Sequence, residues 1–287
     1  MKQNKKKLLL VLGWILILIA LGLLSIQLIY LILHRKFQIE YIDNRLFYII
    51  NIFVFICIFI SLRVLNVFKE KLKALSAILF TLLVVFNIVL SIQDNRNIKN
   101  IVSISPDFKH VFSVKSNQKN NEAIYYRDYY KILARPKEII ELEISDNNDI
   151  KWLANDIAVL TSYDGEQPNI FIGTYGDRND AVSYYYVAAE IQGIWENEDV
   201  RVKSSPDGVQ ITENNRSIDF QWKDIEQYGT LAIVLRKDHE DSWVIALNKD
   251  FKVQSDASKD LVGSISLYNA SPKNTKVYNL GFISRTY

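Results

Sequence analysis

An uncharged apolar run of 26 residues, Leu8 to Leu33, constrains this chain more than any other feature. The hydrocarbon core of a bilayer is about 30 Å thick, and about 20 helical residues are enough to cross it. The run exceeds the roughly 7 to 15 apolar residues of a secretory signal peptide, and no Ala-x-Ala cleavage pattern closes it. We therefore predict a retained membrane-spanning helix, although a basic leader precedes the run.

Two further apolar segments follow the first, and each is near the shortest length that spans a bilayer. The second segment becomes longer if Arg63 snorkels along its flexible stem toward the headgroups. The sequence therefore predicts a membrane domain over 1–93 with three transmembrane helices, at about residues 8–33, 46–66 and 75–92. The lipid bilayer is accordingly the first partner that we predict.

Basic residues in the short flanks predict the orientation, because loops rich in Lys and Arg stay on the cytoplasmic side. The N-terminal leader and the loop between the second and third segments together carry eight Lys and Arg, whereas the opposite side carries five. This difference predicts a plasma-membrane protein with a cytoplasmic N-terminus. The chain beyond about residue 94 is then extracytoplasmic.

The two parts of the chain also differ in charge. Residues 1–93 carry 11 Lys and Arg against 3 Asp and Glu, whereas residues 94–287 carry 23 against 29. Because affinity for nucleic acid comes from clustered Lys and Arg, the acidic second part predicts no nucleic-acid partner. The single cysteine, Cys57, lies in the second apolar segment, so the exterior part has no disulfides. With abundant Lys, Asn and Ile, this composition favours a bacterial surface protein.

The rest of the chain has the pattern of a β domain. Residues 94–100 are polar and predict a linker, and thirteen short alternating or β-rich runs follow in 101–287. The runs leave no room for the helical crossovers that parallel strands need, and only residues 223–228 are expected to form a helical turn. We predict an all-β, mostly antiparallel, sandwich- or propeller-like extracytoplasmic domain, as one unit or as two halves that meet near residue 200.

Aromatic residues supply the candidate ligand-binding side chains of this β domain. Aromatic faces stack on sugars, so the candidates are Tyr126, Tyr130, Tyr185 and Trp195, and the ligand would be a cell-envelope glycan. Tyrosine is also favoured in strands, and adjacent tyrosines point to opposite sides, so packing inside the domain is the alternative. Tyrosines that gather on one exposed face would favour binding.

Asp177 and Asp180 are candidate metal ligands, because they place hard oxygen atoms close together on an expected loop. Such oxygens suit calcium outside the cell. The further acidic positions and the glycine of an EF-hand loop are missing, so a plain turn is the alternative. We predict no resident cofactor.

Asn51 and Asn87 are the polar residues of the apolar segments that we predict to make contacts between helices. The uncharged runs of these segments hold no Asp, Glu, Lys, Arg or His, so a transport path through them is not favoured. Asparagine in such a setting is expected to form hydrogen bonds between helices, or to the helices of another membrane protein.

No catalytic residue is predicted. The sequence lacks a Gly-x-Ser-x-Gly elbow, a His-Glu-x-x-His zinc motif and a Gly-x-x-x-x-Gly-Lys phosphate loop, and His110 and His239 are the only histidines beyond the apolar segments. We therefore expect a non-catalytic, membrane-anchored binding, sensing or scaffolding protein. Two alternatives stay open: a cell-envelope hydrolase acting on glycan or peptide, with carboxylates or a histidine converging in one cleft, and an accessory or immunity subunit of a membrane transporter.

Overall fold

A computed structural model describes most of the chain. The described residues are 2–141, 144–163, 168–176, 178, 186–238, 242–254, 259–271 and 276–286, with side chains from residue 6 onward. Two compact units divide the chain. The first contains residues 1–102 and 113–139, and the second contains residues 103–112 and 140–287.

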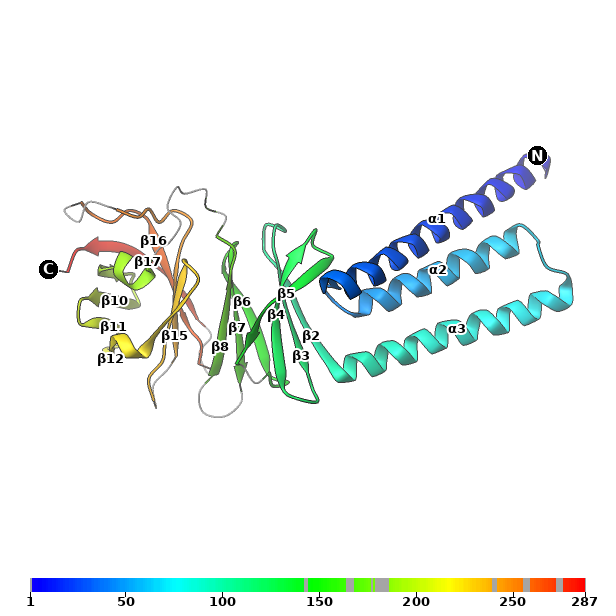
Figure 1. Cartoon of the computed structure of the whole chain (residues 1–287). Coiled ribbons are helices and arrows are strands. Elements are labelled where there is room, and N and C mark those ends of the chain that lie inside the picture. The colour runs from blue at the N-terminus through cyan, green and yellow to red at the C-terminus, as the bar shows by residue number, and fades with distance from the viewer. Residues whose placement is uncertain are drawn as a thin grey trace. The chain divides into compact units, whose positions relative to one another are not determined.

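Three long helices make up most of the first unit and lie side by side in Figure 1: α1 (Lys2–Phe37), α2 (Arg45–Val64) and α3 (Glu70–Asn97). Each contains a segment that is long and apolar enough to cross a membrane. Many Leu, Ile and Phe side chains along them are exposed. The prediction of three long apolar helices is confirmed.

Polar side chains connect α1 to α2 at two levels. The buried Ser61 hydroxyl on α2 donates to the Gly13 carbonyl oxygen at 2.8 Å, and the buried Gln27 amide on α1 donates to the Phe47 carbonyl oxygen at 3.0 Å. The Tyr41 hydroxyl in turn donates to the Gln27 side-chain oxygen at 3.2 Å. Neither Gln27 nor Ser61 was among the predicted helix contacts.

Five strands, which lie before and after the helices α2 and α3 in sequence, form a sheet in the order β1-β5-β4-β3-β2. Its strands are β1 (Glu40–Tyr41), β2 (Ile98–Ile104), β3 (Val111–Asn117), β4 (Glu122–Tyr129) and β5 (Leu133–Ile140). Helix α3 ends at Asn97 and β2 begins at Ile98, so the segment 94–100, predicted as a linker, is helix and strand instead. Strand β1 lies between α1 and α2 in sequence and pairs with β5. The connection between the first two helices is therefore part of this sheet.

A buried ion pair joins β3 to the α1–α2 connection. The Nζ atom of Lys115 lies 2.5 Å from Glu40 Oε2, 2.8 Å from the Tyr41 carbonyl oxygen and 2.7 Å from Asn44 Oδ1. An ammonium has three N–H donors, so these three acceptors satisfy it. The ammonium also lies 4.6 Å from the ring centroid of Tyr126. Burial lowers the pKa of Lys115, and the charge of Glu40 opposes this effect.

The second unit contains a nine-stranded sheet in the order β12-β11-β10-β9-β17-β16-β15-β14-β13. Every neighbouring pair is antiparallel, as predicted. The strands are β9 (Gly193–Glu196), β10 (Val200–Ser205), β11 (Gly208–Glu213), β12 (Arg216–Phe220), β13 (Ile225–Tyr228), β14 (Ala232–Leu235), β15 (Trp243–Leu247), β16 (Ser264–Asn269) and β17 (Val277–Ser284). Residues 223–228, expected to form a helical turn, form the end of a 3-10 turn, Trp222–Asp224, and then β13.

This sheet curls around one apolar core. Ile211 on β11 belongs to the same buried cluster as Ile233 on β14 and Ile245 on β15, although these strands lie far apart in the sheet order. Helix α4 (Val187–Glu190) packs into the same cluster. Strands near both ends of the order can share a core only if the sheet bends back toward itself, as in a barrel. The strands thus form one continuous curled sheet and not the separate four-stranded blades of a propeller.

A second layer covers the opposite face of β14, β15 and β16, toward one end of the sheet. Strands β6 (Asn148–Ala154), β7 (Ile157–Tyr163) and β8 (Pro168–Thr174) form an antiparallel sheet in the order β6-β7-β8. Val159 of this sheet packs in one cluster with Val234 and Val244, whose neighbours Ile233 and Ile245 belong to the barrel core. Alternate residues of a strand point to opposite faces, so β14 and β15 are buried on both sides.

Candidate functional site

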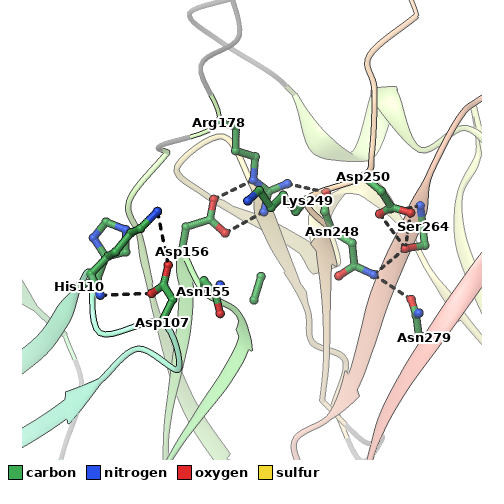
Figure 2. A pocket seen from close by; sticks show the side chains of 12 residues that line it. Asp107, His110, Asn155, Asp156, Arg178, Asn248, Lys249, Asp250, Ser264 and Asn279 are labelled. Atoms are coloured by element: carbon green, nitrogen blue, oxygen red, sulfur yellow. Dashed lines mark hydrogen bonds and ion pairs between the residues drawn. The ribbon is translucent and has the colours of Figure 1, made fainter.

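A polar pocket of about 510 Å³ lies in the second unit, and Figure 2 shows the side chains that line it. The lining residues come from the β2–β3 turn, the β6–β7 turn, the segment after β8, the segment after β15, and strands β16 and β17. Ligand pockets commonly have volumes of about 300 to 1,000 Å³, so this one can hold a small molecule or one part of a larger one.

A bidentate ion pair forms one wall of the pocket. Nε and Nη2 of Arg178 donate to the two carboxylate oxygens of Asp156 at 2.7 and 2.9 Å. The same guanidinium donates to the carbonyl oxygens of Leu247 and Asn248, both at 2.7 Å. Both side chains of the pair are almost fully buried. Arg178 therefore ties the β6–β7 turn to the end of β15 and holds the Asp156 carboxylate in one orientation.

Asn248 is the centre of a second network, on the other side of Arg178 in Figure 2. Its amide donates to Ser264 Oγ at 2.9 Å and to Asn279 Oδ1 at 2.8 Å, while its oxygen accepts from Ser266 Oγ at 2.7 Å. Ser264 Oγ also lies 2.9 Å from Asp250 Oδ1. These bonds fix the direction of amide and carboxylate groups from β17 and the segment after β15, and of serine hydroxyls from β16.

Aromatic rings lie next to the pocket. The imidazole of His110, which lines it, stacks on Tyr175 with ring centroids 4.3 Å apart, and Trp152 stacks on the same tyrosine at 5.9 Å. The Trp152 indole N–H donates to Ser103 Oγ at 2.9 Å. His110 is thus held by a packed aromatic stack at the edge of a hydrogen-bonding surface.

The β2–β3 turn contributes a further carboxylate, that of Asp107, to the pocket lining. Ser105 Oγ donates to Asp107 Oδ1 at 2.8 Å, and the Lys109 amide donates to the same oxygen at 3.2 Å. The Ser105 hydrogen bond lowers the pKa of the Asp107 carboxyl, which favours its ionised form. Among the residues that the structure describes, no cluster of His, Cys, Asp and Glu has the composition of a metal site.

Of the predicted aromatic site residues, the three that the structure describes do not line this pocket. Tyr126 is buried beside Lys115 in the first unit, and Tyr130 is 89% exposed at the β4–β5 turn. Trp195 has no exposed surface, and its indole N–H donates to the Ile191 carbonyl oxygen at 2.8 Å. A fully buried ring offers no face to a ligand, so the structure gives Trp195 a packing role. Tyr185 lies outside the described residues.

The predicted metal ligands Asp177 and Asp180 also lie outside the described residues, as does His239. Arg178, between the two aspartates in sequence, was not predicted. Its partners Asp156 and Asn248 are far from it in the chain, and no sequence motif links them. His110 was the one available signal, as one of two histidines in the β part of the chain.

The two predicted helix contacts differ in their surroundings. The Asn87 amide donates to the Leu83 carbonyl oxygen at 3.0 Å, which is a bond within α3. Asn51 is half-buried on α2. The hydrogen bonds between α1 and α2 instead come from Gln27 and Ser61, which were not among the residues predicted from the sequence.

Comparison with known proteins adds no functional information. The chain matches no protein-family model, and no curated sequence or solved structure is significantly similar to it. Function therefore has to be inferred from the chemistry of the pocket and from the apolar helices.

Proposed function

We propose that this chain is a plasma-membrane protein whose three helices span the bilayer, with the N-terminus in the cytoplasm and the β part outside the cell. There, the polar pocket binds a polyhydroxylated ligand, a glycan of the cell envelope, without chemical turnover. The observation that carries this proposal is the hydrogen-bonded network of Asp156, Arg178 and Asn248 beside the His110 ring.

The network suits a sugar for two reasons. Each sugar hydroxyl both donates and accepts, and the pocket offers carboxylate and amide oxygens together with amide, guanidinium and ammonium donors. These groups are already held by neighbours, so little side-chain entropy is lost when a ligand binds. Asn155, Lys249 and Asn279 line the same pocket from exposed positions, where a ligand can reach them.

One observation favours a hydrolase as a second candidate. The pocket brings His110 together with Asp107, Asp156 and Asp250, the kind of convergence that acid–base catalysis requires. The Asp156 carboxylate is engaged by Arg178, however, and Asp250 accepts a hydrogen bond from Ser264. Binding is therefore the better account. Mass spectrometry tests for the release of smaller fragments from purified cell-wall glycan or peptide. Release by the unmodified protein that is lost in His110→Ala would favour hydrolysis over binding without turnover.

Orientation is tested by cysteine labelling of the full-length protein in a Cys57→Ser background. Lys249→Cys should react with a membrane-impermeant maleimide on intact cells, because the pocket faces the exterior. Lys69→Cys, in the loop between α2 and α3, is the matched control and should react only after the cells are permeabilised. The reverse pattern contradicts the proposed orientation.

Ligand binding is tested on the full-length protein in detergent by thermal shift against sugars, cell-wall fragments and divalent cations. A ligand at one hundred times its dissociation constant should stabilise the fold by about 2.7 kcal/mol. Lys249→Ala should weaken the response, whereas Lys252→Ala, an exposed lysine of the same segment outside the pocket lining, should not. A response that both variants weaken equally would place the ligand elsewhere.

A further inference from the structure

A second pocket, of about 750 Å³, lies in the first unit between the last turn of α1 and strands β4 and β5. Helix α1 contributes His34 and Arg35, β4 contributes Ile124 and Tyr126, and β5 contributes residues 136–139. The pocket is open, and its lining combines charged groups with aliphatic side chains.

The position of this pocket along α1 is informative. The uncharged run of α1 ends at Leu33, and the next residue, His34, already lines the pocket. If the helices span the bilayer, as proposed above, the last turn of α1 lies where the hydrocarbon core gives way to the headgroup layer. The pocket then opens at the depth of phospholipid phosphates.

The charges around the pocket leave a positive excess. Glu40 is neutralised by Lys115, and Glu138 lies 3.7 Å from Lys137 in an exposed pair. Within the part of the chain that the structure describes, no carboxylate pairs with Arg35, which is exposed in the last turn of α1. One unpaired guanidinium complements the single negative charge of a phosphodiester, and arginine can bind phosphate through two parallel hydrogen bonds.

The same pocket has an apolar side. Ile139 lines it and is 66% exposed, and Ile124 lines it from β4. A free phosphate ion would make no use of these side chains, whereas the glycerol and upper acyl carbons of a lipid would cover them. The combination of cation and exposed aliphatic surface at one depth therefore fits a lipid better than an inorganic anion.

We propose that this pocket binds the headgroup of an anionic phospholipid in the leaflet that surrounds the C-terminal end of α1. Arg35 contacts the phosphate, and Ile139 packs on the glycerol region. The bound lipid would connect the end of α1 to the β4–β5 hairpin. This inference rests on the proposal that the helices span a membrane, and it is independent of glycan binding by the second unit.

The test uses full-length protein that has been delipidated in detergent and is then titrated with short-chain phosphatidylglycerol or phosphatidylcholine. Native mass spectrometry counts the lipids that remain bound. We expect one phosphatidylglycerol to bind more tightly than phosphatidylcholine, and Arg35→Gln to weaken it at least about fivefold. Lys36→Gln is the matched control, because this neighbouring cation of the same helical turn does not line the pocket.

Several outcomes would overturn the proposal. Equal losses in Arg35→Gln and Lys36→Gln would show only general attraction to a basic helix end, and displacement of the lipid by millimolar inorganic phosphate would identify an anion site instead. Equal binding of phosphatidylglycerol and phosphatidylcholine would also contradict the proposed lipid site. Alkaline carbonate extraction of membranes separates the two proposals, because release of the protein would refute membrane spanning itself, whereas retention without lipid preference refutes only the pocket.

Discussion

The two units differ in the kinds of side chain that make the buried contacts between their helices and strands. In the second unit, Trp195 has no exposed surface and packs edge-on against Phe282, with other members of one apolar core around it. In the first unit, the helices expose most of their apolar side chains, and the buried apolar cluster between α1 and α2 is small, with Ala20, Val54 and Cys57 at its centre. Lys115, Gln27 and Ser61 add buried polar contacts between separate elements. If the exposed apolar surface faces lipid, as proposed above, it cannot hold the helices together as it would in water, so directional polar bonds contribute more to their arrangement.

The largest expected effect is in the apolar core of the second unit. Trp195→Ala should lower the free energy of unfolding by about 3 to 5 kcal/mol, because the cavity has no side chain to fill it. Urea unfolding of the full-length protein in detergent, followed by tryptophan fluorescence, measures the change. Trp195→Phe keeps most of the volume and should cost clearly less. Equal losses in the two variants would show that the indole N–H bond to Ile191, and not the packing, dominates.

Disrupting the buried ion pair of the first unit should cause a comparable loss of stability, which a second substitution should reverse. Lys115→Met leaves Glu40 without its partner and should destabilise the unit by about 3 kcal/mol, because a buried charge is then uncompensated. The double variant Lys115→Met with Glu40→Leu should recover most of the loss. Thermal unfolding of the full-length protein in detergent compares the three proteins. A double variant as unstable as the single one would contradict a role based on charge pairing.

Alkaline pH should destabilise the second unit by an intermediate amount. Burial raises the pKa of Tyr228 from its ordinary 10 to about 12, and its hydroxyl donates to the Ile170 carbonyl oxygen at 3.1 Å. The folded state therefore holds the proton more tightly than the unfolded state, so this stabilisation is complete below pH 10 and is lost as pH rises through about 12.

We expect this loss to be about 1 to 2 kcal/mol, allowing for the partial exposure of the side chain. Urea titrations between pH 9 and pH 12 measure it. Tyr228→Phe should flatten the pH dependence, whereas the exposed Tyr130→Phe should leave it unchanged. An identical pH profile in Tyr228→Phe would remove Tyr228 as the cause.

The smallest expected effects concern single polar groups of the helices. Ser61→Ala removes the bond to the Gly13 carbonyl oxygen and should cost about 1 kcal/mol. Asn87→Ala should stay within about 0.5 kcal/mol, because the lost bond lies inside α3. Thermal unfolding in detergent compares the two. A larger loss from Asn87→Ala would restore the interhelical role that the sequence predicted for it.

The structure explains which predictions succeeded. Long apolar runs and period-two alternation are local patterns, and they correctly predicted three apolar helices and an antiparallel β region. Strand β6 begins at Asn148, although the Asn147-Asn148 pair is typical of a turn. The segment 94–100 was read as a linker from its polarity, although hydrogen bonding within the five-stranded sheet makes its end the start of β2.

The candidate site was beyond prediction because its residues meet through strand pairings that alternation does not encode. Asn279 reaches Asn248 through the consecutive pairings of β15, β16 and β17. Asp156 and Arg178, in contrast, come from the β6–β7 turn and the segment after β8, which belong to a different sheet. Alternation within a strand does not determine which sheet packs beside it. The sequence by itself determined the apolar helices, the β class and the charge difference between the two parts, because length, hydropathy and charge are properties of contiguous residues. Only the tertiary structure decided which strands are neighbours, which rings are buried and which polar groups converge on the pocket, because those depend on contacts between distant segments.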